Sequence, residues 1–517
     1  MRFLGSNAVA VLTALVAVMF AWIYGGIRPQ YVVPVMPWAW LILAEAMLCF
    51  PEARPGESTF AARARVCRAF RSDPLVWLTA AFTVLLLVPL VNVGLCPQCD
   101  AELIAAGRDA APPLPFLPFC ANRPEHLTTL VWFVPALTCA LAVRHSMRRH
   151  GKRLVLTLVV ISGVVLGVLG LVQKLLDAPG PLWANIANLQ RSDFFSTFGY
   201  ANMAGDYFAT LFGLSIGLWR DHADRCRRED ARNGRRIRSS ADLFRLLLAR
   251  HWPLLASAVL FVSALATLSR AAILIVTAMA GVLFVHTLAS FLARLRPGAR
   301  LAAVAVAVGV TFALVSAVGG MLPKSLRKEA GKISLEETVN RVTGKSSRGT
   351  SLAFAVWRDY PVFGCGGNGY RHFSRPKMTS EDTLFFEYDW GRAGLANVHN
   401  DCVQILAEYG LAGLALLAAI VVLVVLPSAR AWRVRCRAAR LDGSRYASPS
   451  GRAFFTLPPG AFAVALTAGA TLVHSLGDCP LRSPAVLTLF FVSLAAAEGF
   501  FPHETTEESQ GITKCST

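Results

Sequence analysis

The sequence of 517 residues is 55% hydrophobic and only 16% charged, a balance that excludes an ordinary soluble enzyme. Apolar runs follow one another along almost the whole length, so we expect a single integral membrane domain over 1–517 rather than several globular domains. The 51 Lys and Arg against 32 Asp and Glu give a formal charge of +19, which is compatible with a nucleic-acid partner, an anionic membrane face or an anionic substrate.

Twelve apolar stretches are each long enough to cross a bilayer as a helix, because about 20 residues span its hydrocarbon core. They predict an all-α, polytopic membrane helical bundle. The first stretch is followed by another span, which favours a membrane helix over a cleaved signal peptide. The stretches are 7–25, 31–50, 75–95, 127–144, 154–173, 197–219, 252–269, 271–293, 300–322, 402–426, 456–475 and 484–502.

Lys and Arg gather in every second connection between the stretches, with ten in 220–251 alone. Basic connections of membrane proteins stay in the cytoplasm, so we expect both termini there, including the tail 503–517. The loops 96–126 and 323–401 then face the other, outer side of the membrane. Topology and contact with membrane lipids account for the basic runs, so no nucleic-acid partner is expected.

Three cysteines lie in the first outer loop, in the order Cys96, Cys99 and Cys120. A structural disulfide among them is plausible, whereas a thioredoxin-like redox site would need a βαβ context that is absent. The ten histidines form no His-Glu-x-x-His or comparable ligand pattern, so neither a metal nor another cofactor is predicted. The first 150 residues carry no recognisable motif.

The long outer loop, 323–401, has 79 residues, more than a helical bundle needs as a connection, and is therefore the place to look for chemistry. A capping-box pattern at 334–337 predicts a short helix over 334–343. A second helix is predicted from about 346 to Asp359, and it stops before Pro361. Arg348 falls in its first turn, where free N–H groups and a guanidinium would favour phosphate. The alternative for Arg348 is a solvated surface arginine.

The end of this loop brings a histidine to the membrane boundary. The glycine-rich stretch 363–369 lacks the strand and the Lys-Ser/Thr of a phosphate-binding loop, so it predicts a tight turn. His399 follows immediately before the tenth span and is either structural or catalytic. Gly410 and Gly413 lie farther along that span, where small residues three apart allow close helix packing and would hold His399 rigidly.

Several polar residues interrupt the spans or their edges: Glu408, Asp206, His286 and Asp478. Such residues are expensive to bury in lipid, so they indicate either function or mutual pairing. Arg270 is a cation on the outer side between the seventh and eighth spans, against the charge rule. An anion would offset its insertion cost, and either a lipid phosphate or a substrate pyrophosphate would serve.

Together these motifs resemble the O-antigen ligase and polymerase superfamily of bacterial membrane glycosyltransferases, over about 190–490. The most specific part is His399-Asn400 followed by Gly410-x-x-Gly413. The other motifs are Thr197-Phe-Gly-Tyr-Ala-Asn202-Met-Ala204, Ser269-Arg270-Ala-Ala, Arg348 with Trp357-Arg-Asp-Tyr-Pro361-Val-Phe-Gly364, and His474-Ser-Leu-Gly-Asp478-Cys-Pro-Leu-Arg-Ser-Pro484.

The resemblance implies a C-type glycosyltransferase-like bundle that moves a glycan from undecaprenyl pyrophosphate to an acceptor hydroxyl, with inversion at the anomeric carbon and without a metal. In that scheme Arg270 and Arg348 stabilise the pyrophosphate leaving group, and His399 accepts the proton of the hydroxyl. The residues expected to bind the substrate or support its site are Arg191, Asn202, Asn400, Glu408 and Asp478.

Four functions remain open at this point. A ligase transfers the glycan to the lipid A core, and we rank it slightly ahead of a polymerase, which extends one lipid-linked glycan with another. Transfer to a protein side chain ranks lower. A transporter for the same lipid-linked glycan ranks lowest, because it should show internal repeats and the sequence shows no convincing one.

Overall fold

The computed structural model of the chain is built from helices over the residues that it describes. The isolated bridges Val93–Cys120 and Phe195–Phe198 are the non-helical pairings recorded there. The all-α prediction is therefore confirmed for this part of the chain. The described residues are 2–26, 29–53, 56–95, 100–105, 112–184, 194–233, 240–292, 299, 348–383, 397–441 and 457–501.

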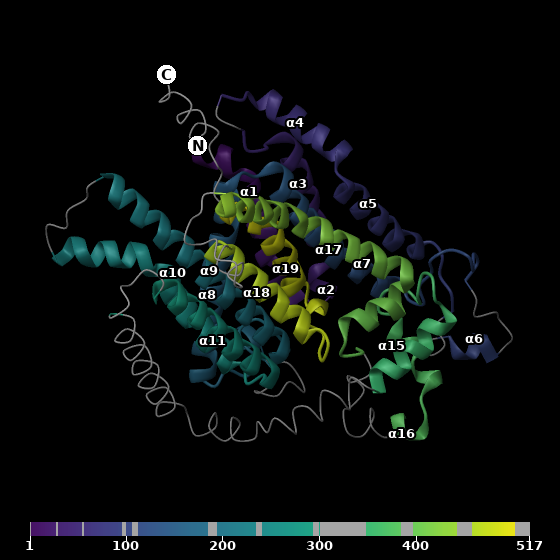
Figure 1. Cartoon of the computed structure of the whole chain (residues 1–517). Helices are drawn as coiled ribbons and strands as arrows, with labels where there is room; N and C mark the ends of the chain where they lie inside the picture. Colours follow the sequence, from purple (N-terminus) through teal and green to yellow (C-terminus); the bar gives the residue numbers. More distant parts are fainter. Residues whose placement is uncertain are drawn as a thin grey trace.

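Long helices make the bundle and short helices connect them (Figure 1). The long helices are α1 (Arg2–Trp22), α3 (Met36–Cys49), α4 (Thr59–Ser72), α5 (Pro74–Leu87), α7 (Arg123–Leu141), α8 (Arg149–Leu175), α9 (Ala201–Asn233), α10 (Ser240–Ala266), α11 (Arg270–Leu292), α17 (Asp401–Leu441), α18 (Pro459–His474) and α19 (Pro484–Ala496). The short ones include α2 (Pro29–Val32), α6 (Ala101–Ala105), α15 (Tyr370–Phe373), α16 (Ser380–Thr383) and the 3₁₀ helices η2 (Val88–Leu90), η9 (Pro480–Arg482) and η10 (Ala497–Phe500).

Several of these helices have the length and composition of membrane spans. Over the described residues four qualify outright, in α7, α8, α11 and α17, and a fifth does if α4 and α5, which meet at a 65° bend, form one broken span. Shorter apolar helices occur in α1, α3, α10, α18 and α19. A multi-pass membrane protein follows from these helices. The count of twelve stays a prediction, and the stretch 300–322 lies outside the described residues.

Two of the basic connections continue the helices beside them. The helix α9 runs on to Asn233 and α10 begins at Ser240, so most of 220–251 is helical and projects from the bundle as a hairpin (Figure 1). The helix α17 likewise extends to Leu441. Polar helical extensions of this kind satisfy their own backbone groups outside the lipid, and Arg153 of α8 secures the hairpin through Asp221 at 2.9 Å.

The helix α19 lies inside the bundle (Figure 1). All thirteen of its residues are buried. It contacts α1, α7, α9, α17 and α18. A helix that is apolar on every side is stable only when other helices surround it. This central position fixes the residues just before it, in the turn between α18 and α19.

The helix α17 is broken at Gly410, and the outer loop fills the break. Gly410 has φ +65° and ψ −166°, so the backbone bonds that would join residues 411 and 412 to 407 and 408 are lost. Residues 361–366 replace them. The N–H groups of Leu411 and Ala412 donate to the carbonyls of Pro361 and Val362, and those of Cys365 and Gly366 donate to the carbonyls of Ala407 and Glu408, all at 2.8–3.0 Å.

The two glycines of the predicted packing motif thus have different roles. Gly413 lies against Leu85 of α5, in agreement with close helix packing. A side-chain carbon on Gly410 would lie only 2.2 Å from the carbonyl oxygen of Val362, so this glycine admits the loop and not a second helix. The predicted turn at 363–369 and the predicted helix before Pro361, helical here over 348–359, are both present. The predicted helix 334–343 lies outside the described residues.

Gly410→Ala should destabilise the protein by at least about 1–3 kcal/mol, because alanine rarely adopts a positive φ and its methyl group would displace the loop. Thermal unfolding of the protein in detergent measures this. Gly469→Ala is the matched control, since a side-chain carbon at Gly469 on α18 would meet nothing within 4 Å. Equal melting temperatures for the two variants would contradict the assignment.

Candidate active site

The candidate site is built where the start of α17 docks on the turn after α18. The backbone N–H of Asp401 donates to the carbonyl of Ser475, and its carboxylate accepts from the Ser475 hydroxyl and from the N–H of Leu481, at 2.9–3.0 Å. The amide of Asn400 donates to the carbonyl of Leu476 at 3.3 Å. These bonds join two segments that are more than 70 residues apart in sequence.

This docking places His399 directly against Asp478. The His399 Nδ1 and Asp478 Oδ1 atoms are 3.0 Å apart, and both residues are 8% exposed. A carboxylate only accepts hydrogen bonds, so Nδ1 carries the hydrogen and Nε2 keeps its lone pair. His399 has φ +56°, a left-handed conformation that non-glycine residues seldom adopt. Strain of this kind persists where the surroundings over-determine a residue, and it is common at functional sites.

Asn202 completes the surroundings of Asp478. Its amide, in the first turn of α9, donates to Asp478 Oδ2 and to the hydroxyl of Tyr200, both at 3.1 Å. Burial alone would raise the pKa of Asp478, but the hydrogen bond from His399, the nearby charge of His474 and the N–H of Cys479 lower it below its ordinary value. Asp478 is therefore a carboxylate at neutral pH.

His399, Asp478 and Cys479 also form a group whose potential ligand atoms lie within 4.8 Å of one another. No motif in the sequence predicted this grouping. The contacts within it are hydrogen bonds, since Asp478 Oδ1 accepts from His399 and from the backbone N–H of Cys479 at 2.9 Å. Burial raises the pKa of the Cys479 thiol well above its ordinary value, which opposes the thiolate that a metal would need. We therefore describe the group as a hydrogen-bonded cluster.

Arg270 is the first residue of α11 and lies beside the same end of α9. A side-chain carbon on Gly205 would lie 2.4 Å from Cβ of Ala272 and 3.2 Å from Cβ of Ser269, so the turn that bears Arg270 packs against the helix that bears Asn202. Arg270 is partly exposed. The predicted cation thus lies in a turn that packs against the helix whose Asn202 binds Asp478.

The segment that bears Arg348 packs against the residue before His399. Arg348 is the first described residue of the helical stretch 348–359, and its side chain is 36% exposed. A side-chain carbon on the next residue, Gly349, would lie 2.7 Å from the carbonyl oxygen of Val398. The guanidinium faces Glu381 and Asp382 of α16 at 3.9 and 3.7 Å. Separations that long describe a loose ion pair, which an anionic ligand could replace.

Glu408 is fully buried and belongs to a hydrogen-bond network beside the site. Its carboxylate accepts from Arg482 Nη1 at 2.6 Å and from Gln404 at 3.0 Å. Arg482 also donates to Asn368 in the glycine-rich turn, and Asn368 in turn binds Glu125 and Thr128 of α7. The geometry gives Glu408 a role in fixing the turn after α18 and does not place it at an open surface.

The remaining predicted residues have other surroundings. Asn400 caps α17, because its side-chain oxygen accepts from the N–H of Val403 at 3.2 Å. Arg191, Cys96 and Cys99 lie outside the described residues. Cys120 is a free, buried thiol that contacts the carbonyl of Pro89, so it does not form the predicted disulfide.

The comparisons with known proteins fall on the segment that carries these residues. Residues 255–418 match the family model described as O-antigen ligase. This segment belongs to the O-antigen ligase family. No curated protein matches the chain. The O-antigen ligase match supports a glycosyltransferase of the ligase or polymerase type.

The O-antigen ligase segment contains some but not all of the candidate site. Arg270, Arg348 and His399 lie inside 255–418. Asn202 and Asp478 lie outside it and reach His399 only through folding. The site combines residues from inside and outside the segment. For this reason the sequence indicated these residues as separate candidates but did not pair them.

Sequence reasoning missed two parts of the site. It placed His474 in a recurrent motif but gave it no role, and the structure sets it against Asp206 of α9 at 2.5 Å. It also gave no role to Arg482, which neutralises Glu408. The spacing of His474 and Asp478, four residues apart, was the one local signal, since such residues face the same side of a helix.

Glu408→Gln should destabilise the protein by about 3 kcal/mol, because it leaves the buried guanidinium of Arg482 without its carboxylate. The melting temperature in detergent measures the loss. The control is Asp359→Asn, which removes the partner of Lys377 in a half-exposed pair and should cost about 1 kcal/mol or less. A Glu408→Gln variant as stable as the control would refute the structural role.

Proposed function

We propose that the chain is an O-antigen ligase-type glycosyltransferase that moves a glycan from undecaprenyl pyrophosphate to a hydroxyl of the lipid A core. One observation carries the proposal: Asp478 holds the imidazole of His399. The residue after Arg348 packs against Val398, and the turn that bears Arg270 packs against α9, which bears Asn202. The family match to 255–418 supports the class of reaction. The O-antigen or exopolysaccharide polymerase uses the same donor chemistry and is the second candidate.

His399 acts as the general base. Its Nδ1 hydrogen bond to Asp478 leaves the Nε2 lone pair to accept the proton of the acceptor hydroxyl. The hydroxyl oxygen forms the new bond to the anomeric carbon as the bond from that carbon to the pyrophosphate oxygen breaks. The leaving pyrophosphate takes the electron pair, and attack from the opposite face inverts the anomeric centre. Asp478 stabilises the imidazolium that results.

Arg270 and Arg348 stabilise the leaving group. Negative charge grows on the pyrophosphate as the bond breaks, and guanidinium groups bind such oxygens in pairs of strong hydrogen bonds. The sequence also predicts that Arg348 lies in the first turn of its helix, where free N–H groups and partial positive charge add to the effect. The proposed reaction therefore runs without a metal ion. We keep the proposal that Asn202 lies beside the substrate. Its hydrogen bond to Asp478 holds it in this position.

The proposal also sets the orientation in the membrane. Because Lys and Arg gather in alternate connections, both termini lie in the cytoplasm of a bacterium and the site faces the periplasm. A lipid-linked donor and the lipid A core that lie in that leaflet of the inner membrane can reach the site by lateral diffusion. The contact partners are then these two lipids and the surrounding membrane.

The acceptor is tested by incubating the purified protein with an undecaprenyl-pyrophosphate glycan and lipid A core, followed by gel mobility of both lipids. We expect glycan on the lipid A core. Longer lipid-linked chains with unchanged core would make the protein a polymerase, and no transfer to either acceptor would refute the proposed reaction.

Replacement of His399 should reduce kcat by about 10²–10⁴-fold at unchanged folding, because no other group accepts the proton. His399→Asn is the sharper variant beside His399→Ala, since asparagine tolerates the left-handed backbone that His399 adopts. The assay is the same transfer reaction, with size-exclusion profiles to check folding. Full turnover in folded His399→Asn protein would exclude the base assignment.

Arg270→Ala and Arg348→Ala should each reduce kcat by about 10²–10³-fold, the loss typical of one charge-stabilising group. Arg375→Ala is the control for charge in the outer loop, because Arg375 lies in the short turn 375–377 and has no role in the proposed reaction. Equal activity of the control and either site variant would remove that arginine from the site.

A further inference from the structure

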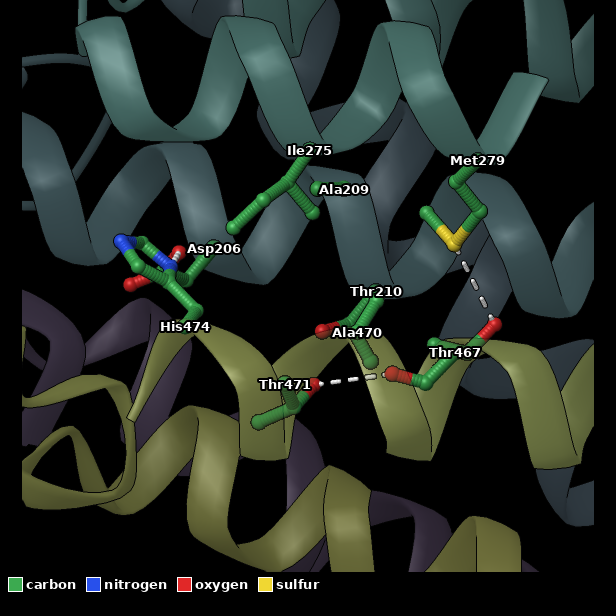
Figure 2. A pocket seen from close by; sticks show the side chains of 9 residues that line it. All are labelled: Asp206, Ala209, Thr210, Ile275, Met279, Thr467, Ala470, Thr471 and His474. Atoms are coloured by element: carbon green, nitrogen blue, oxygen red, sulfur yellow. Dashed lines mark hydrogen bonds and ion pairs between the residues drawn. The ribbon is translucent and has the colours of Figure 1, made fainter. Parts of the chain in front are cut away.

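A second histidine and aspartate lie directly behind the candidate base. His474, the last residue of α18, faces Asp206 of α9, with Nδ1 and Oδ1 2.5 Å apart. The two side chains are 6–7% exposed, and Figure 2 shows them pointing toward one another across the gap between the two helices. The proposed reaction uses neither of them so far.

These two residues extend the pair formed by His399 and Asp478. The other ring nitrogen of His474, Nε2, is 3.8 Å from Asp478 Oδ2, while Asp478 Oδ1 binds His399. The order is therefore His399, Asp478, His474, Asp206. Imidazole and carboxylate alternate along this row, from the outer end of α17 into the bundle between α9 and α18.

The alternation fixes the charge that the row must carry. His474 stands between two buried carboxylates, and a neutral ring there would leave both negative charges uncompensated in a medium of low dielectric. With His474 as an imidazolium and His399 neutral, the row has a net charge of −1. It becomes neutral when His399 takes the acceptor's proton, so the transfer relieves an excess negative charge.

The other charged or titratable groups near the row lie around Asp478. Tyr200 is linked to it through Asn202, Asp401 binds the same turn, and Arg482 is held by Glu408. Over the described residues, His474 is therefore the cation that faces Asp478 Oδ2 most closely.

Helix packing alone does not require the ion pair. The helices α9 and α18 already touch through glycine: side-chain carbons on Gly213 and Gly217 would lie 2.1 Å from Oγ1 of Thr467 and 2.8 Å from Cβ of Ala463. On the inner side of the pair a cavity of about 10 Å³ is lined by Thr210, Thr467 and Thr471 (Figure 2). That volume is near the size of one water, and the apolar residues Ala209, Ile275, Met279 and Ala470 complete the lining.

We propose that Asp206 and His474 are positioning residues for the transfer reaction, which hold a positive charge against Asp478 and thereby keep Asp478 aligned with His399. The inference rests on the proposed function. Asp206 keeps the ring of His474 in place, and His474 places its positive charge 3.8 Å from Asp478 Oδ2, the oxygen that also accepts from Asn202. The other oxygen, Oδ1, orients the base. Outer partners of this kind commonly change activity by about 10–100-fold.

The test uses Asp206→Asn, His474→Gln and the double variant, in which two amides preserve a neutral hydrogen-bonded pair. We expect kcat of each to fall about tenfold or more, with KM for the lipid-linked donor within about twofold of the wild type. The acidic limb of the profile of kcat/KM against pH should move to higher pH. The reason is that, once the positive charge of His474 is removed, the negative charge of Asp478 favours the protonated form of His399 more strongly.

Thr467→Val is the matched control, because Thr467 lines the same cavity on α18 and binds only its own helix and Met279. It should keep the wild-type kcat and pH profile. Folded variants of Asp206 and His474 with the wild-type kcat and pH profile would overturn the inference while the proposed function stands. If the wild-type protein showed no transfer that depends on His399, both the inference and the proposed function would be overturned.

Discussion

The docking of residues 397–401 on the turn after α18 is the contact on which the candidate site depends. The carboxylate of Asp401 accepts two hydrogen bonds from that turn, and the backbone of Asp401 donates a third. Each end is fixed independently, because α19 is enclosed on every side and α17 is braced by the loop that fills its break at Gly410. Two rigid supports can hold an imidazole and a carboxylate at 3.0 Å with a strained backbone at His399.

The charged and titratable side chains of the candidate site come from four segments of the chain. Arg270 comes with α11, Arg348 with the outer loop, His399 with α17 and Asp478 with the turn before α19. In the proposed reaction the two arginines stabilise the pyrophosphate and the carboxylate of Asp478 orients the base. Opposite charges arranged before the substrate arrives need no reorganisation during the reaction, which is the largest contribution that many active sites make.

Much of the fold could be predicted from the sequence, because lipid imposes a simple rule on apolar stretches and on Lys and Arg. The helix before Pro361 and the glycine-rich turn also followed from local chemistry. The pairing of His399 with Asp478 and of Asp206 with His474 did not, since 79 and 268 positions separate the partners and no periodicity encodes a contact across a bundle. The break at Gly410 could not be predicted either, because the sequence of a span does not show whether its glycine packs against a helix or against a loop.

The central claim is that His399 and Asp478 act as one unit, and a double-variant cycle on kcat tests it most directly. His399→Asn, Asp478→Asn and the double variant are assayed in the transfer reaction beside the wild type. If the carboxylate acts through the imidazole, the double variant is no slower than His399→Asn alone, within about twofold. Losses that multiply, so that the double variant is slower by the product of the single effects, would contradict the account.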